Sequence, residues 1–369
     1  QKLIQKITEK NQTCKFHEGA KAIDDFIINN LSQIYIPITR GELWDESEEK
    51  KNRRLAIYAV LNKVLKTLDI LIHPFCPYTS EHLYQTVFEG KQSILLDKWP
   101  QYQESLVNEE IEESFDIMKD VVSISSAARM KGKLKRRWPL NEAQICVKKN
   151  QKSKLESLSS LLKSQLNVEK FNIVETEMEE GLGQLLELKE LKLPVKSTLE
   201  LERKKIGPKV KQHMGKVVSM FSETNPDEII SSIQKDGKYD FKIDSEIISL
   251  DKEDFIVNFD SKEDFAVAKR DGFVVFISTS RNKEMMAKGL VKDIARRLQT
   301  LRKERGYNPT DVLDVASILE LDKESLEMIK ERKEELAFLV RVKKVDFEKS
   351  CKEYKDDDID GQKIKISVE

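Results

Sequence analysis

The sequence predicts an α+β protein of several domains, in which an antiparallel α-helical bundle precedes small α/β domains. Its 369 residues exceed one ordinary domain, and 39% of them are hydrophobic, which is enough for several cores. Before residue 128, apolar residues recur at steps of three and four, which is the period of amphipathic helices. After Pro139, short apolar runs typical of strands alternate with helical stretches.

Three long helical stretches define the predicted bundle. One carries its apolar side chains along a single face, at Phe16, Ala20, Ile23, Ile27, Leu31 and Ile34. From Leu55 to Ile72 the apolar residues face almost every direction, so we expect this helix at the centre of the bundle. His73-Pro74 ends it, because the residue before a proline disfavours the helical conformation. The third stretch is amphipathic and contains Ile111, Phe115, Met118 and Val122.

Four domains follow from these patterns. We place the bundle at residues 1–128 and a first small α/β domain at 129–195. A connecting domain with a basic helix and short strands occupies 196–276, and Asp271-Gly272 within it predicts a hairpin turn. A distal small α/β domain occupies 277–369. The first and the distal α/β domain repeat the order helix, proline, strand, helix, strand, starting at Lys119-Asp120 and Lys292-Asp293. This repeated order predicts that one module is duplicated.

Composition argues against several functional classes. The formal net charge is only −1, so the chain as a whole is not a polybasic binder. The four cysteines are far apart and lack zinc-ligand spacing, which predicts reduced, buried thiols and no metal site. The sequence has no long apolar run and no signal peptide, which predicts a cytoplasmic protein that does not bind membranes. Because the chain starts at Gln1 and not at Met, we expect a fragment.

Catalytic motifs are missing from the sequence. The four histidines have no serine or cysteine partner in a recognisable motif. Gly181 and Gly183 lack the third glycine and the preceding strand of a dinucleotide-binding loop. We therefore expect neither an active site nor a cofactor within this chain.

Local clusters of cations are the positive signal for function. Residues 129–138, which we call the basic segment, contain no acidic residue; their charged and aromatic members are Arg129, Lys131, Lys133, Lys135, Arg136, Arg137 and Trp138. Phosphates attract several cations at once and unstacked bases need flat groups, so this composition predicts RNA binding. The alternative is a solvated basic loop in which Trp138 closes a core.

Two other clusters are less distinct. Arg40, Arg53 and Arg54 bracket Trp44, for which the alternative is an anchor in the core of the bundle. The helix of residues 292–305 has one apolar stripe, and the cations on its other side and flanks are Lys292, Arg296, Arg297, Arg302 and Lys303. An ordinary solvated helix face is the alternative for this second set.

Short motifs in series between residues 16 and 310 carry a family resemblance. The first group is Leu31-Ser32-x-x-Tyr35, Arg40-x-x-Leu43-Trp44, His73-Pro74-Phe75-Cys76-Pro77-Tyr78, Ser93-Ile94 and Trp99-Pro100. It resembles the anticodon-binding helical bundle of the class I aminoacyl-tRNA synthetases for isoleucine, valine and leucine. The second group is Arg136-Arg137-Trp138-Pro139-Leu140 and Gly289-Leu290 through Arg302-Lys303. It is similar to the C-terminal domains of the archaeal and eukaryotic isoleucine enzymes.

The resemblance implies the C-terminal region of an archaeal- or eukaryotic-type isoleucyl-tRNA synthetase, which grips the anticodon stem-loop of tRNA(Ile). Its implied tRNA contacts are Arg129, Lys133, Arg136, Arg137, Trp138, Arg40, Trp44, Arg53 and Arg54, with the cations of the 292–305 helix as a secondary basic face. The family departs from this sequence at Glu42, where an arginine is usual, and at Lys288, where an acidic residue is usual.

The same resemblance implies where the ligase chemistry resides. ATP and Mg belong to a catalytic domain with HIGH and KMSKS elements, which this sequence lacks. That domain and the editing domain would lie upstream of Gln1, so we expect the chain to be inactive by itself, monomeric, and partnered by the catalytic half of the same enzyme. Two alternatives stay open: the same region of a valyl- or leucyl-tRNA synthetase, and a protein-interaction module without direct RNA contact.

Overall fold

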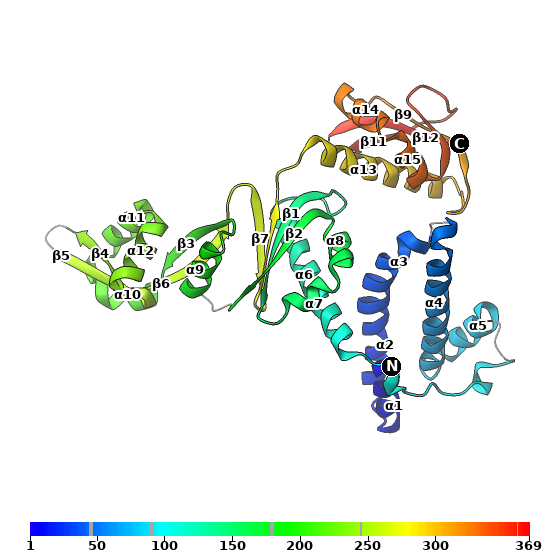
Figure 1. Ribbon diagram of the computed structural model, residues 1–369, viewed down its shortest axis with the longest axis horizontal. Helices are drawn as coiled ribbons and strands as arrows, with labels where there is room; N and C mark the ends of the chain where they lie inside the picture. Colours follow the sequence, from blue (N-terminus) through cyan, green and yellow to red (C-terminus); the bar gives the residue numbers. More distant parts are fainter. Residues whose placement is uncertain (44–46, 89–91, 178–180, 244–245, 360) are drawn as a thin grey trace. The chain divides into compact units, whose positions relative to one another are not determined.

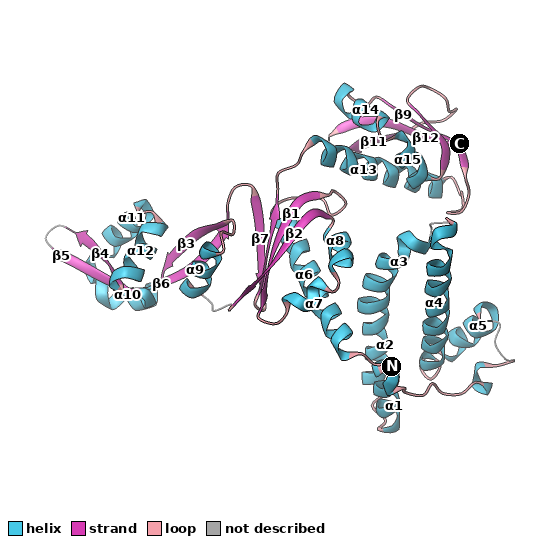
Figure 2. Ribbon diagram, viewed as in Figure 1, coloured by secondary structure: helices cyan, strands magenta, loops and turns pink. Residues whose placement is uncertain are grey.

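The computed structural model describes residues 1–43, 47–88, 92–177, 181–243, 246–359 and 361–369 (Figure 1). The chain is an α+β protein that divides into two compact units, Gln1–Glu112 and Glu113–Glu369. The first unit contains helices but no strand among its described residues, whereas the second contains helices and sheets (Figure 2). In the described chain, every helix is too short or too polar to cross a membrane.

Helices of the first unit follow the predicted apolar pattern. They are α1 (Lys2–Gln12), α2 (Phe16–Asp25), a π-helical stretch (Phe26–Tyr35) that continues into α3 (Ile36–Leu43), α4 (Lys51–Ile72) and α5 (Pro77–Val87). Pro77 occupies the first turn of α5, where its missing N–H has no helical partner to lose. A small core forms where Ile4 and Ile7 of α1 meet Ile23 of α2 and Leu71 of α4.

Helix α4 differs from its prediction. It was expected to be buried on all sides, yet Leu55, Tyr58, Val60 and Leu65 are exposed, and its buried residues are Ile57, Leu68, Asp69 and Leu71. The main contacts of α4 within the described chain come from α2, α3 and α5, which leave part of its apolar surface uncovered. The prediction of full burial was wrong because a run of apolar residues reveals nothing about how many neighbours are present.

The second unit begins with a long helix and a four-stranded sheet. The helix α6 (Glu109–Lys131) leads into β1 (Leu140–Lys148), which α7 (Lys152–Glu156) and α8 (Ser159–Leu166) connect to the parallel strand β2 (Val168–Thr176). The hairpin of β7 (Phe265–Arg270) and β8 (Phe273–Ser278) pairs antiparallel with β1, which gives the order β2-β1-β8-β7. We call α6 and this sheet with its helices the first module. Asp271 and Gly272 both have positive φ, which confirms the predicted hairpin turn.

Residues 177–264, which we call the insertion, separate β2 from β7. They form α9 (Leu182–Glu190), β3 (Val195–Leu201), α10 (Arg203–Val210), α11 (Met214–Glu223), α12 (Pro226–Asp236), β4 (Lys238–Ile243), β5 (Glu246–Asp251) and β6 (Phe255–Ser261). Strand β3 pairs with β6 and β4 pairs with β5, both antiparallel. The apolar core of the insertion continues to Cys146, Val274 and Phe276 of the first sheet.

A second module completes the chain. It consists of α13 (Lys283–Glu304), β9 (Leu313–Leu319), α14 (Lys323–Lys330), α15 (Lys333–Val340), β10 (Val342–Asp346), β11 (Lys355–Ile359) and β12 (Gln362–Val368). Its sheet has the order β10-β9-β12-β11, with β9 and β10 parallel and the other pairs antiparallel. Strand order and strand direction therefore match those of the first module, position by position.

Candidate nucleic-acid interface

The basic segment begins where α6 ends. Lys133 adopts a left-handed conformation with φ of 53°, a position that glycine usually fills after a helix. The N–H of Leu134 then donates to the carbonyl of Arg129 at 2.8 Å, which closes the helix end. The chain turns here and reaches β1 at Leu140. The segment consequently wraps around the end of the helix, and its cations point in several directions.

Arg129 lies inside the protein. Its side chain belongs to a residue only 4% exposed, and its two terminal nitrogens donate to the carbonyls of Lys135 (3.1 Å), Trp138 (3.0 Å), Leu166 (2.8 Å) and Asn167 (3.1 Å). Burial, with the nearby cations Arg136 and Arg281, lowers the pKa of Arg129 to about 10. The guanidinium therefore donates to two carbonyls of the basic segment and to two at the end of α8, none of which has a partner within a helix. This burial corrects the expectation that Arg129 faces RNA.

Trp138 is also an interior residue. It is 7% exposed, and its indole N–H donates to Oδ2 of Asp293 on α13 at 2.9 Å. Arg281 lies over the ring at 4.8 Å from the centroid, and Gly289 packs so closely that a Cβ there would come within 2.4 Å of the indole. The ring has no face free for a base. The alternative drawn from the sequence, that Trp138 closes a core, describes the structure.

Asp293 draws two more cations of the basic segment inward. Its carboxylate is 1% exposed and accepts a hydrogen bond from Lys135 Nζ at 2.9 Å, and Arg137 Nη1 is 3.4 Å away. Burial raises the pKa of this carboxyl, but the hydrogen bonds from Lys135 and Trp138 and the charges of Lys135 and Arg137 outweigh it, and the pKa falls below its ordinary value. Asp293 thus stays ionised and neutralises part of the segment.

Three cations of the basic segment stay on the surface, and we call them the exposed triplet: Lys131, Lys133 and Arg136. None has an ion-pair partner among the residues that the structure describes. Lys131 also lines a hollow of about 180 Å³ that Lys269 and Thr198 share. The triplet is the part of the predicted site that can contact phosphates.

The predicted cluster in the first unit is only partly open. Arg40 is exposed, Arg54 is half-buried, and exposed Arg53 forms an ion pair with Glu42 at 2.8 Å. Trp44 lies outside the described residues. Glu42, one position at which the sequence departs from the pattern of the similar enzymes, therefore neutralises one of the predicted cations, Arg53.

The secondary basic face on α13 is divided between surface and interior. Lys292 is half-buried, donates to Asn167 Oδ1 at 3.3 Å, and has a pKa lowered by burial. Arg297 contacts Asp357 and the carbonyl of Asp358. Only Arg296 and Lys303 of the predicted set are exposed. Two exposed cations make a weak phosphate-binding surface.

Arg302, the remaining member of that set, repeats the contacts of Arg129. It is 5% exposed and donates to the carbonyls of Asn308 (3.2 Å), Asp311 (2.7 Å), Val340 and Arg341 (3.0 Å). Each arginine thus binds the carbonyls six and nine residues further along and two carbonyls just before the parallel strand. Asn167 and Arg341, the last residues before those strands, both adopt left-handed conformations.

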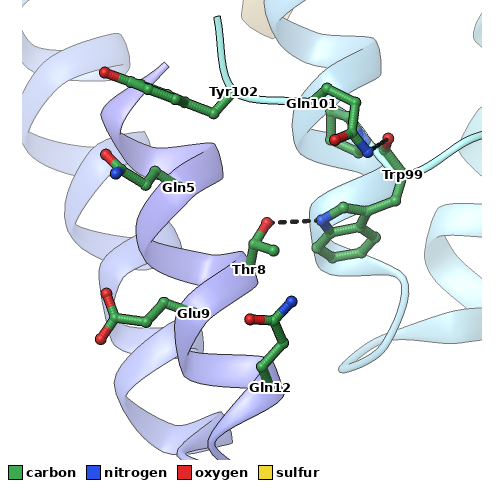
Figure 3. A pocket seen from close by; sticks show the side chains of 8 residues that line it. Gln5, Thr8, Glu9, Gln12, Trp99, Gln101 and Tyr102 are labelled. Carbon is green, nitrogen blue, oxygen red and sulfur yellow. Dashed lines mark hydrogen bonds between the residues drawn. The ribbon is translucent and has the colours of Figure 1, made fainter. Parts of the chain in front are cut away.

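A pocket in the first unit was missed by the sequence analysis (Figure 3). It measures about 310 Å³ and is lined by Gln5, Thr8, Glu9, Gln12, Trp99, Pro100, Gln101 and Tyr102. The indole N–H of Trp99 donates to Thr8 Oγ1 at 2.8 Å, and Figure 3 shows Gln5 and Gln12 before and after Thr8 along α1. Polar residues at steps of three and four in α1 were the available signal, but such a stripe is usually just the solvated side of a helix.

The thiols and carboxylates of the described chain do not form a metal centre. No group of three or more histidine, cysteine or acidic residues among the described residues could hold a metal ion. Cys146 and Cys351 are buried and free, as expected, and burial raises the pKa of Cys146 to about 12. Cys14 and Cys76 are exposed, so the prediction of burial was wrong for these two. Both stand beside helix ends, where neighbouring elements cover less of the surface.

Comparisons with known proteins find similarity to tRNA ligases. Residues 1–145 match the family described as the anticodon-binding domain of tRNA ligase. The chain is 28% identical to an isoleucine–tRNA ligase of Sulfolobus acidocaldarius, an alignment that covers 85% of this chain and 28% of the relative. It is 28% identical to the Pyrococcus furiosus enzyme (94% and 31%) and 29% identical to the Methanocella arvoryzae enzyme (100% and 33%). The chain therefore spans about a third of the length of these curated relatives.

Proposed function

We propose that this chain binds the anticodon stem-loop of tRNA(Ile). Two observations support the proposal: residues 1–145 match the anticodon-binding domain of tRNA ligase, and the chain is similar to archaeal isoleucine–tRNA ligases over most of its length. The ATP-dependent attachment of isoleucine then belongs to the part of the relatives that this chain does not span. That part, with its ATP and Mg, is the partner that would use the tRNA held here.

The exposed triplet is the observation that carries the proposal. Lys131 is the last residue of α6, Lys133 and Arg136 follow within five residues, and no described acidic side chain pairs with the three cations. Each cation that neutralises a phosphate releases counterions, so three such contacts predict a log–log salt slope of about −2 to −3. Phosphate contacts fix the position of the RNA but carry no sequence information. A second surface must read the bases.

The pocket of the first unit supplies the groups that base recognition needs. Trp99 is fixed by its bond to Thr8 and packs against the core of α1, so one aromatic ring is held without RNA. The side-chain amides of Gln5 and Gln12 have no hydrogen-bond partner among the described residues, and each amide can both donate to and accept from a base edge. We assign this pocket to one unstacked base of the anticodon loop, with Tyr102 as a second stacking surface.

We also propose that the two modules are copies of one ancestral module. The equal strand orders and directions support this, and so do the buried arginines with the same four carbonyl contacts. A shared fold alone could arise independently, but a buried arginine with four matched acceptors is a costly arrangement to assemble twice. In this view the insertion entered one copy between its second and third strands.

Binding of short RNA hairpins tests the proposed function. Fluorescence anisotropy would compare hairpins that differ only in carrying isoleucine, valine or leucine anticodons. We expect the isoleucine hairpin to bind tightest. Tyr102→Ala should weaken it by about 1–3 kcal/mol if the ring stacks on a base. Gln103→Ala, an exposed neighbour outside the pocket, is the matched control and should have no effect. Equal binding of all hairpins would overturn anticodon recognition.

Exposed apolar side chains favour a second candidate, a protein-docking module. Helices α4 and α5 expose Leu55, Tyr58, Val60, Leu65, Leu83 and Val87. Such side chains together are typical of a surface that another protein covers. Salt separates the two candidates, because apolar docking changes little with ionic strength whereas phosphate binding weakens steeply. A chain that binds no RNA hairpin at low salt would favour the docking function.

A further inference from the structure

Asp293 belongs to the second module, yet its carboxylate lies within the basic segment of the first. The carboxylate is 1% exposed and contacts Lys135, Arg137 and Trp138, all of which lie more than 150 residues earlier in the chain. A buried carboxylate has a high desolvation cost unless cations and donors surround it. Here all of its close partners come from the segment that precedes β1.

Helix α13 contacts the first module through residues 288, 289, 292 and 293. Gly289 lies one turn before Asp293. Glycine is the only residue type that leaves room at this position for the indole of Trp138, because a Cβ there would overlap the ring. Lys288 pairs with Glu169 of β2 at 2.9 Å, and Lys292 donates to Asn167 at the end of α8. The contact is therefore a shaped interface between α13 and the first module.

The contact changes the charge that the basic segment presents. Lys135 and Arg137 turn toward Asp293, whereas the exposed triplet, Lys131, Lys133 and Arg136, keeps no described acidic partner. The guanidinium of Arg129 donates its hydrogen bonds to backbone carbonyls. Without Asp293, Lys135 and Arg137 would lose the carboxylate that neutralises them, and the turn that carries the triplet would lose its anchor at Trp138.

We propose that Asp293 is a positioning residue through which the second module sets the RNA-binding surface of the first. It neutralises two partly exposed cations of that surface, Lys135 and Arg137, and holds the triplet in one arrangement, so RNA is selected by the spacing of its phosphates and not by charge alone. The inference rests on the proposed tRNA function. It gives the second module a role in RNA binding that requires no contact between that module and the RNA.

Asp293→Asn is the primary test. The amide still accepts the indole N–H but no longer neutralises Lys135 and Arg137. We expect the log–log salt slope of hairpin binding to steepen by about 1–2, because Lys135 and Arg137 are no longer neutralised by Asp293 and can contact phosphates. The preference for the isoleucine hairpin over an unrelated hairpin should fall several-fold. A residue with only a structural role would weaken binding without steepening the slope. Asp314→Asn is the matched control, since exposed Asp314 pairs with Lys343 of the same module, away from the segment.

Two further measurements keep the outcome decisive if Asp293→Asn folds poorly. Gly289→Ala disturbs the packing of the Trp138 ring against α13 without changing any charge. It should therefore reduce the preference for the isoleucine hairpin over an unrelated hairpin and leave the salt slope unchanged. Trypsin cleaves after lysine and arginine, so cleavage within the basic segment should be faster in both variants than in the wild type or in Asp314→Asn, with no RNA present.

The outcomes separate this inference from the proposed function. If the wild type binds no hairpin, the proposed function fails, and a positioning role in RNA binding fails with it. If the wild type discriminates among hairpins but Asp293→Asn and Gly289→Ala match Asp314→Asn in slope, preference and cleavage, only the role of Asp293 is overturned.

Discussion

Helix α6 of the first module leads into a turn rich in cations, whereas after α13 of the second module only Arg305 is charged before the uncharged sequence Gly306-Tyr307-Asn308-Pro309-Thr310. The backbone of the two turns is nevertheless alike. In each, a left-handed residue lies four positions after the buried arginine, Lys133 in one and Gly306 in the other. In each, the carbonyl nine positions after that arginine accepts one of its hydrogen bonds, from Trp138 and from Asp311.

The two long helices also differ at one equivalent position. Asp120 stands nine residues before Arg129, and Asp293 stands nine residues before Arg302. The side chain of Asp120 is 52% exposed and pairs with Arg270 on β7, whereas that of Asp293 is 1% exposed and holds the basic segment. The comparison separates two tasks: a buried arginine builds the turn in both modules, and the side chains displayed on the turn determine what it binds.

The largest expected effect comes from the shared part of the comparison. Arg129→Met and Arg302→Met each remove a buried cation and leave four carbonyls without that donor. We expect each to lower the free energy of unfolding by about 3–5 kcal/mol, the range for breaking a buried charged contact. Urea denaturation followed by circular dichroism measures it. A loss below about 1 kcal/mol in one module but not the other would break the equivalence of the two arginines.

Trp138→Phe tests the contact that only the first module has. The phenyl ring keeps apolar packing against Gly289 but cannot donate to Asp293. One hydrogen bond to a buried carboxylate is lost, so we expect a cost of about 1–3 kcal/mol. Tyr307→Phe, on the corresponding turn of the second module, is the control and should change stability little, because no described side chain bonds its hydroxyl. Equal effects of the two substitutions would contradict the asymmetry.

The smallest expected effect comes from exchanging the left-handed residues. Lys133→Gly relieves an unfavourable backbone conformation and Gly306→Lys introduces one. We therefore expect changes of about 1 kcal/mol in opposite directions. Thermal unfolding of both variants provides the measurement. A stabilisation by Gly306→Lys would show that the two turns are not built alike.

Local patterns were enough to predict several features of the fold. The helical period predicted the helices of the first unit, and Asp271-Gly272 predicted the hairpin between β7 and β8. The pairing of that hairpin with β1 depends on residues more than a hundred positions apart, so no local period could reveal it. Residues 265–276, placed in the connecting domain by the sequence, belong to the two strands that complete the first sheet in the structure.

The candidate site was harder to predict for a related reason. A run of cations and a tryptophan shows where charge is concentrated but not which side chains find internal partners. Arg129 is buried by carbonyls that lie up to 38 residues away, and Trp138 by a carboxylate 155 residues away. Only those distant contacts distinguish a Trp138 ring that stacks on RNA from one that closes a core.

The salt dependence of RNA binding shows whether the exposed triplet contacts phosphates. The triple variant Lys131→Gln, Lys133→Gln, Arg136→Gln would be compared with Lys196→Gln, Lys204→Gln, Lys235→Gln, which removes the same charge from exposed lysines of the insertion. We expect the first triple variant to lower the magnitude of the slope of log binding constant against log salt concentration for the isoleucine hairpin by about 2–3, and the second triple variant to leave this slope unchanged. Equal slopes for the two triple variants would contradict it.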